Sequence, residues 1–208
     1  MNQLKKIFKK IFQGKKNKKD HSLIFKWIKE GKPLPPPHLV KQIIIKNERD
    51  KSSYNTLIET GTYLGEMVEV QKKNFKKVYS IELGKELYSN AVKRFKDDRN
   101  VVILQGDSGI ILKKLMTQIN EPAIFWLDGH YSEGITAKGE KECPIFEELT
   151  AIFASRKLNH KILVDDARLF NGTKDYPTIK ELMDFIKDKG QNFDFILKDD
   201  IIRISLLS

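Results

Sequence analysis

Three absences narrow the class of protein before any motif is considered. Cys143 is the only cysteine among 208 residues, so no disulfide can form within the chain, and a reducing compartment is expected. No apolar run approaches the roughly 20 residues of a membrane span. The beginning of the chain lacks the long apolar core and small-residue cleavage site of a secretory signal. These absences favour a cytoplasmic protein.

Acidic residues are scarce in residues 1–20, which hold eight lysines and only Asp20. That segment carries +7 of the formal net charge of +10, which leaves +3 for the rest of the chain. So mild a charge does not indicate a nucleic-acid partner. Within residues 1–13, apolar side chains share one helical face between lysines. This pattern fits either peripheral contact with an anionic membrane, such as the inner membrane face, or a solvated basic tail.

The chain divides into three parts. Residues 1–20 form a basic tail and linker. Residues 21–54 are expected to be a helical N-terminal extension, in which Ser22 caps a first helix that Gly31 ends. A proline-rich spacer and a second helix through Ile43 and Ile44 follow. Residues 55–208 form the main domain, which is long enough to bury a core.

Short apolar strands alternate with amphipathic helices from residue 55 onward. We expect strands at 55–59, 77–82, 101–105, 123–127 and 161–164, and helices at 65–76, 84–97, 109–120, 144–157 and 177–189. Two last strands, 193–197 and 201–206, are separated by a tight turn and read as a hairpin. The pattern predicts a doubly wound α/β fold, with a seven-stranded, mostly parallel sheet and a C-terminal antiparallel hairpin.

A glycine-containing turn follows the first strand, in the stretch Glu59-Thr60-Gly61-Thr62-Tyr63-Leu64-Gly65. The glycines let a bound group approach the backbone, and the first free N–H groups of the next helix point at that group. Glu82 ends the second strand, where a carboxylate can accept hydrogen bonds from a ribose diol. By itself the glycine pair also fits an ordinary strand-to-helix turn.

Acidic residues stand at the ends of the other strands too. Asp107, followed by Ser108, comes after the third strand, Asp128 after the fourth, and Asp165-Asp166 after the fifth. In a doubly wound sheet, ligands bind at the carboxyl ends of the strands. Asp128, Asp165 and Asp166 offer three oxygen ligands for a hard cation such as Mg²⁺. The alternative is that one of the paired acids forms an ion pair with Arg168 or caps a turn.

The stretch from 129 to 143 is a long loop with three glycines, and such loops are often functional. His130 is a candidate general base because neutral imidazole is available at pH 7; a structural role is the alternative. Tyr131, Thr136 and Lys138 could order around an acceptor, and polar side chains of this kind suit a hydroxylated or anionic molecule.

With these motifs the sequence resembles the class I S-adenosylmethionine-dependent methyltransferases. The resemblance implies that Glu59 to Gly65 form the first cofactor motif, that Glu82 binds the ribose, and that Asp107 and Ser108 meet the adenine. It implies that Asp128 faces the methionine end of the cofactor. Asp128, Asp165 and Asp166 resemble the metal triad of divalent-metal-dependent O-methyltransferases of the catechol and macrolide-sugar types. The catechol type has Asp-Asn where this chain has Asp165-Asp166.

The resemblance predicts methyl transfer to an oxygen of a small hydroxylated or phosphorylated acceptor, such as a sugar or surface-polysaccharide precursor. Asp128 and His130 would be catalytic, Mg²⁺ would assist, and Arg168 would join the loop residues in binding the acceptor. One alternative is a metal-independent O- or N-methyltransferase. Others are an RNA methyltransferase and a membrane-recruited module that binds the cofactor without turnover. The glycine spacing and the terminal hairpin oppose a nicotinamide dehydrogenase.

Overall fold

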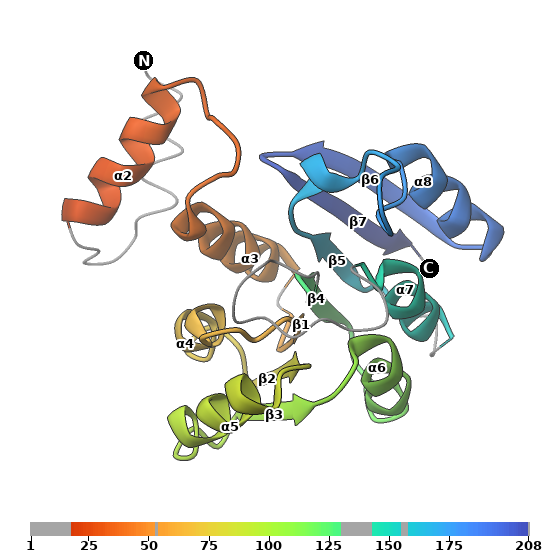
Figure 1. The fold of residues 1–208 in the computed structure, drawn as a ribbon, viewed down its shortest axis with the longest axis horizontal. Helices are drawn as coiled ribbons and strands as arrows, with labels where there is room; N and C mark the ends of the chain where they lie inside the picture. Colours follow the sequence, from red (N-terminus) through yellow and green to blue (C-terminus); the bar gives the residue numbers. More distant parts are fainter. Residues whose placement is uncertain (1–17, 53, 130–142, 155–157, 208) are drawn as a thin grey trace.

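The protein is described here by a computed structural model that covers residues 18–52, 54–129, 143–154 and 158–207. Seven strands form one sheet in the order β3-β2-β1-β4-β5-β7-β6 (Figure 1). They are β1 (Thr56–Thr60), β2 (Lys77–Glu82), β3 (Val101–Gln105), β4 (Ala123–Leu127), β5 (Lys161–Val164), β6 (Asn192–Lys198) and β7 (Ile201–Leu207). β1 to β5 are parallel, whereas β7 runs antiparallel to β5 and β6. The predicted doubly wound sheet with its terminal hairpin is confirmed.

Seven α-helices and one 3₁₀ helix belong to the described residues. They are α2 (Lys18–Lys29), α3 (His38–Ser52), α4 (Glu66–Gln71), α5 (Lys85–Arg94), α6 (Ser108–Met116), α7 (Ile145–Phe153), η1 (Ala167–Leu169) and α8 (Ile179–Asp188). The prediction of Ser22 as a helix cap is wrong, because α2 already begins at Lys18. α4 ends at Gln71 rather than near residue 76. The Asn74 side chain donates to the Val70 carbonyl at 3.3 Å and so competes with the helical backbone bond.

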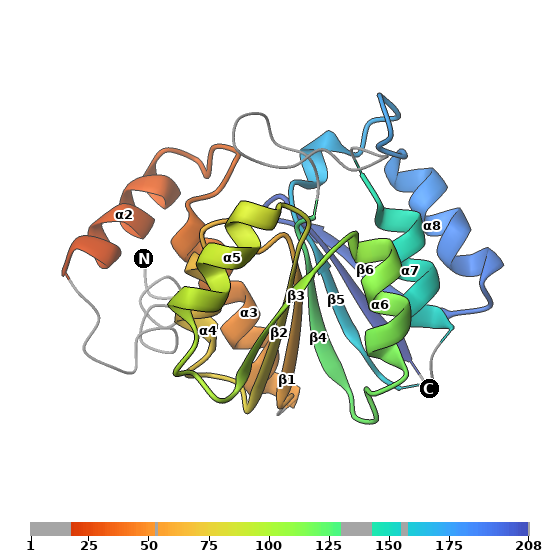
Figure 2. The same cartoon turned by 60° about the horizontal axis from the view of Figure 1, so that its bottom comes forward.

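Alternate residues of each central strand enter two separate apolar layers. Leu57, Ile124 and Trp126 pack with α2, α3, α4 and α5 on one face of the sheet. Ile58 and Phe125 pack with α6, α7 and α8 on the other face. Figure 2 shows the sheet between these two groups of helices. Both faces are covered, as the near-continuous apolar strands require.

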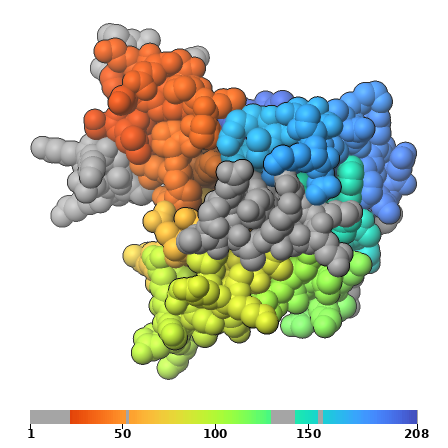
Figure 3. Space-filling model, viewed as in Figure 1, coloured from red at the N-terminus to blue at the C-terminus, as the bar shows by residue number. Residues whose placement is uncertain are grey.

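The helices before β1 are part of the first layer. Ile45 of α3 is fully buried, and Trp27 of α2 donates to the Pro33 carbonyl at 2.8 Å. Lys32, between the two helices, forms an ion pair of 2.9 Å with Asp199 in the β6–β7 turn. Figure 3 shows this early segment against the late part of the chain. Among the described residues, no helix has the length and apolarity to cross a membrane.

Candidate active site

The turn after β1 passes very close to the tip of β4. Gly61 has φ +83°, and a Cβ atom built on it would lie 2.3 Å from the Asp128 carbonyl oxygen. The Gly61 N–H donates to the Ile81 carbonyl of β2 at 2.9 Å. Gly65 has φ +76°, and its Cβ would lie 2.7 Å from the Phe95 ring. Both positions therefore require glycine. Without side chains at these two positions, the backbone of the turn lies close to β2 and β4 and stays accessible to a bound group.

Glu59 lies inside β1, with only 2% of the residue exposed. Its carboxyl accepts a hydrogen bond of 2.5 Å from the Ser80 hydroxyl, which lies 2.7 Å from the Thr62 hydroxyl. Burial raises the pKa of Glu59 to about 8, although the Ser80 hydrogen bond opposes this. Glu59 is therefore mostly protonated at pH 7, and its carboxyl can donate as well as accept a hydrogen bond.

Glu82 is held by one backbone N–H group of the glycine turn and by one from the segment after β2. Its Oε2 accepts from the Tyr63 N–H and its Oε1 from the Gly84 N–H, both at 2.8 Å. Tyr63 itself has φ +51° and is half exposed beside this carboxylate. The two bonds fix the orientation of Glu82 at the end of β2 and leave further lone pairs on each oxygen for a ligand.

Asp107 and Ser108 lie where β3 passes into α6. Asp107 occupies the N-cap position, but its side chain makes no capping hydrogen bond. The Ser108 hydroxyl donates to the Glu148 carboxylate of α7 at 2.6 Å. A Cβ atom on Gly129 would lie 3.1 Å from the same carboxylate and 3.0 Å from the Thr60 hydroxyl. The Thr60 hydroxyl is buried and has no hydrogen-bond partner among the described residues.

Three carboxylates meet at the ends of β4 and β5. Asp128, Asp165 and Asp166 each offer an oxygen, and these oxygens lie within 4.8 Å of one another. The Asp128 N–H donates to Thr60 and the Asp165 N–H to Leu127, which extends both ladders past the strand ends. Asp165 is only 1% exposed, and its Oδ1 has no hydrogen-bond partner among the described residues. Oxygen ligands in this number suit a hard divalent cation.

The comparisons with known proteins rest on structure alone, because no protein-family model and no curated protein matches the sequence. The O-methyltransferase TomG from Streptomyces achromogenes, solved with S-adenosylmethionine, aligns with a TM-score of 0.59 and 15% identity, over 97% of this chain and 95% of its own. An O-methyltransferase from Bacillus cereus, solved with S-adenosylhomocysteine, gives 0.59 and 11%, over 93% and 92%. The methyltransferase PaMTH1 from Podospora anserina gives 0.58 and 14%, over 89% and 88%. The fold is that of the class I S-adenosylmethionine-dependent methyltransferases.

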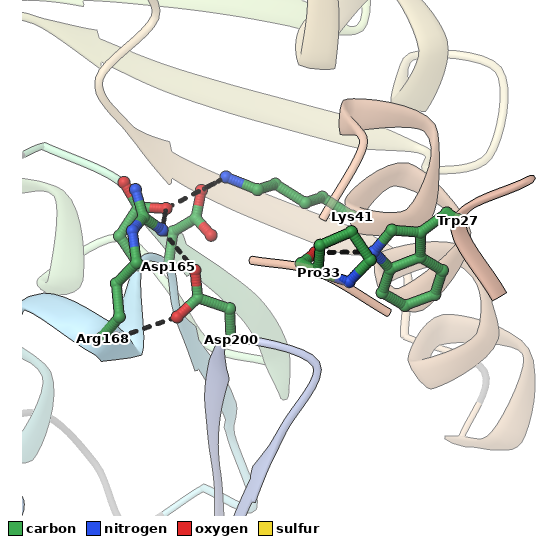
Figure 4. Close-up of polar contacts among 7 residues, drawn as sticks. Trp27, Pro33, Lys41, Asp165, Arg168 and Asp200 are labelled. Carbon is green, nitrogen blue, oxygen red and sulfur yellow. Dashed lines mark hydrogen bonds and ion pairs between the residues drawn. The ribbon is translucent and has the colours of Figure 1, made fainter. Parts of the chain in front are cut away.

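On this methyltransferase fold, two cations offset part of the negative charge of the acidic cluster. The ammonium of Lys41, from α3, contacts Asp165 Oδ2 (Figure 4). It also lies 3.3 Å from Asp166 Oδ1. Arg168 lies 2.7 Å from Asp166 Oδ1 and also contacts Asp200. Burial and then the charge of Asp166 raise the pKa of Asp165, although Lys41 opposes this. Burial is the largest single influence on the pKa of Lys41 and lowers it. The charge and the hydrogen bond of Asp165, with the charges of Asp166 and Asp128, together outweigh burial, so the pKa is raised.

Arg168 was expected to bind the acceptor, and the structure gives it internal partners. Its backbone N–H donates to Asp200 Oδ1 at 2.8 Å, and the Ala167 N–H donates to the Asp200 carbonyl at 2.9 Å. Asp166 has φ +52°, a left-handed conformation that aspartate tolerates. The alternative of an Asp166–Arg168 ion pair is present. A direct contact of Arg168 with an acceptor stays a prediction.

Sequence reasoning missed Lys41 and Glu148. Lys41 is one lysine in a helix of mixed pattern, and no local signal distinguishes it from its neighbours. Glu148 stands among the apolar residues of α7 but is itself only 2% exposed. The available signal for Glu148 was an acid in a helical stretch whose other residues, apart from Glu147 and Thr150, are apolar.

A small pocket adjoins the acidic cluster on the α7 side. It is lined by Leu127, Gly129, Cys143, Pro144, Ile145, Glu148, Val164, Asp165, Phe170 and Tyr176. Most of this lining is apolar, with Asp165 and Glu148 as its charged members. Burial raises the pKa of the Cys143 thiol to about 12, which keeps this residue neutral and fits an inert packing role.

Several predicted site residues lie outside the described residues. They are His130, Tyr131, Thr136 and Lys138, together with the basic segment 1–13. Their roles stay predictions.

Proposed function

We propose that this chain is an S-adenosylmethionine-dependent methyltransferase that methylates an oxygen of a small acceptor. The observation that carries the proposal is that two sets of residues lie together at one edge of a methyltransferase fold. These are the glycine turn with Glu82 and the carboxylates of Asp128, Asp165 and Asp166. Two of the solved structures of the same fold are O-methyltransferases by their descriptions, which supports oxygen as the methylated atom.

The cofactor would lie across the tips of β1, β2 and β3. Glu82 would bind the ribose hydroxyls, since its carboxylate is already oriented by the Tyr63 and Gly84 N–H groups. Asp107 and Ser108 would meet the adenine, and Thr60 to Gly65 would line the rest. The buried Thr60 hydroxyl without a described partner fits a bound polar group at this position. Asp128, beside the glycine turn, would face the methionine end.

Methyl transfer requires an acceptor oxygen in line with the sulfonium methyl group and in a deprotonated state. Asp128 stands between the cofactor side and the acidic pair, so it can orient an acceptor hydroxyl toward the methyl group. His130 would accept the proton of that hydroxyl. The loop residues Tyr131, Thr136 and Lys138, with Arg168, would bind the remaining polar groups of the acceptor.

The donor set of Asp128, Asp165 and Asp166 fits Mg²⁺, and the unpartnered Asp165 Oδ1 is a ready ligand. When bound there, the metal would lower the pKa of the acceptor hydroxyl. A metal-independent transferase is the second candidate, and one observation favours it. Lys41 already places a positive charge on two of the three carboxylates.

For the acceptor we favour a sugar or a phosphorylated surface-polysaccharide precursor, on the sequence resemblance and the polar loop. Peripheral contact of residues 1–13 with an anionic membrane would place the enzyme near such precursors. We also propose that the chain divides into a basic tail (1–20), a helical extension (21–54) and a cofactor-binding domain (55–208).

Calorimetric titration of the full chain with S-adenosylmethionine tests the proposed function. We expect binding to the unaltered protein and at least tenfold weaker binding to Glu82→Gln, because the ribose loses a charged acceptor. Glu86→Gln is the matched control, since it removes an exposed carboxylate four residues later in α5 and should bind normally. Absence of cofactor binding to the unaltered chain would refute the proposal. Mg²⁺ heat that is lost in Asp165→Ala/Asp166→Ala would support metal assistance.

A further inference from the structure

Lys41 joins the N-terminal helices to the reacting edge of the sheet. It lies on α3, and its side chain is only 13% exposed. The helix is anchored by Ile44 and Ile45, which pack in the apolar layer against β1 and β4. Figure 4 shows the side chain extended from the helix toward Asp165, 124 residues away in the sequence. Packing therefore fixes the helix position from which the flexible Lys41 side chain reaches the cluster.

The ammonium occupies the side of the cluster that a bridging metal would need. It contacts Asp165 Oδ2 and Asp166 Oδ1, so it engages two of the three carboxylates that could hold a cation. A magnesium ion needs its oxygen ligands at about 2.0–2.1 Å. An ion at that distance from both oxygens would stand within a few ångströms of the lysine charge, where two positive charges repel strongly in a partly buried site.

One carboxylate oxygen of the acidic cluster remains available as a ligand for a metal ion. Asp165 Oδ1 is buried and has no hydrogen-bond partner among the described residues, although Oδ2 of the same carboxylate is engaged by Lys41. Arg168 approaches from the other side and divides its contacts between Asp166 and Asp200. Of the two cations, Lys41 alone contacts Asp165.

We propose that Lys41 is the built-in counter-ion of this cluster and that it competes with a divalent cation for the carboxylates of Asp165 and Asp166. The inference rests on the proposed function, because it concerns the edge where the acceptor would react. Divalent cations bind weakly while the ammonium stays in place, and metal entry requires the Lys41 side chain to withdraw. Lys41 is thus the residue that sets whether this methyltransferase fold works with or without a metal.

Manganese binding to the full chain, measured without cofactor by the electron paramagnetic resonance signal of free Mn²⁺, tests the competition. We expect Lys41→Gln to bind Mn²⁺ at least tenfold more tightly than the unaltered protein, because it removes the charge but keeps a hydrogen-bond donor. Lys46→Gln is the matched control: it removes the same charge from the exposed pair with Asp50 on the same helix. Its manganese affinity should stay within twofold of that of the unaltered protein.

Two further variants locate the effect and protect the test against misfolding. Adding Asp165→Asn to Lys41→Gln should abolish the gain, since it removes a ligand. Lys41→Arg keeps the positive charge and should show no gain. If Lys41→Gln is unfolded in metal-free buffer, millimolar MnCl₂ should restore its circular dichroism spectrum, because the ion replaces the lost charge. Failure of that rescue contradicts the proposal.

Equal manganese affinity of Lys41→Gln and the unaltered protein would overturn the inference, whether both bind tightly or neither binds. Titration of the same preparations with S-adenosylmethionine separates this failure from that of the proposed function. A manganese gain without cofactor binding refutes only the methyltransferase proposal. Normal cofactor binding without a manganese gain refutes only the role of Lys41.

Discussion

At the scale of single residues, Gly61 shows how closely the segments pack at the edge of the sheet that holds the candidate active site. Its positive φ is one constraint, and the Asp128 carbonyl oxygen, 2.3 Å from where a Cβ atom would stand, is a second, independent one. The first constraint concerns the local backbone alone. The second concerns the approach of two strands, and it keeps the glycine turn against the acidic residue that follows β4.

Gly61→Ala should lower the free energy of unfolding by roughly 3 kcal/mol or more, because the left-handed conformation costs about 1–2 kcal/mol and the overpacking about 1–3 kcal/mol. Gly31→Ala separates the two causes. Gly31 has nearly the same φ, +81°, but nothing lies within 4 Å of its Cβ position. Its cost should be only about 1–2 kcal/mol. Urea unfolding measures both, and equal losses would mean that the Asp128 contact contributes nothing.

At the scale of elements, α3 contributes both to the core and to the candidate active site. It contributes Val40, Ile43, Ile44 and Ile45 to the apolar layer that also contains Leu57 and Trp126 of the central strands. It also carries Lys41 to the acidic cluster. The same helix therefore stabilises the core and supplies a charge to the candidate active site.

Ile45→Ala should destabilise the whole protein by about 2–5 kcal/mol, the range for truncation of a fully buried aliphatic side chain. Phe25→Ala, which truncates a side chain of α2 that is 62% exposed, should change stability by less than about 0.5 kcal/mol. Both values come from urea unfolding followed by circular dichroism. A negligible loss in Ile45→Ala would show that α3 detaches without affecting the core.

At the scale of the whole molecule, the two ends of the sheet differ in chemistry. The carboxyl ends of β1 to β5 hold the acidic residues of the candidate site, whereas His160 lies at the opposite end and binds neighbouring strands there. Its Nδ1 accepts from the Ala123 N–H at 3.2 Å, and its carbonyl accepts from the Leu206 N–H at 3.0 Å. His160 thereby joins the starts of β4 and β5 to the end of β7. Burial lowers its pKa to about 4 from 6.5.

This pKa predicts loss of stability in acid. Between pH 6.5 and about 4 the unfolded chain binds a proton at His160 that the folded chain does not, so stability falls as the pH is lowered through this window. The slope is at most about 1.4 kcal/mol per pH unit. Urea unfolding at pH 7 and pH 4.5 should show a smaller loss for His160→Asn than for the unaltered protein. Equal losses would contradict a buried neutral imidazole.

The sequence by itself determined most of the elements and the edge at which the candidate site lies. Periodicity placed strands at 77–82, 101–105, 123–127 and 161–164, and β2, β3, β4 and β5 have these bounds. The strand-end rule brought Asp128, Asp165 and Asp166 together correctly, because parallel strands present their carboxyl ends at one edge. These inferences need only local pattern and the polarity of a parallel sheet.

Only the tertiary structure decided the charge state and the partners of that edge. Lys41 reaches Asp165 across 124 residues, and Glu148 reaches Ser108 across 40. Periodicity tells which side of a helix is buried, but not which residue of another element lies opposite. The raised pKa of Glu59 likewise follows from burial among neighbouring strands rather than from its motif. Contacts between distant segments depend on packing, which local sequence does not encode.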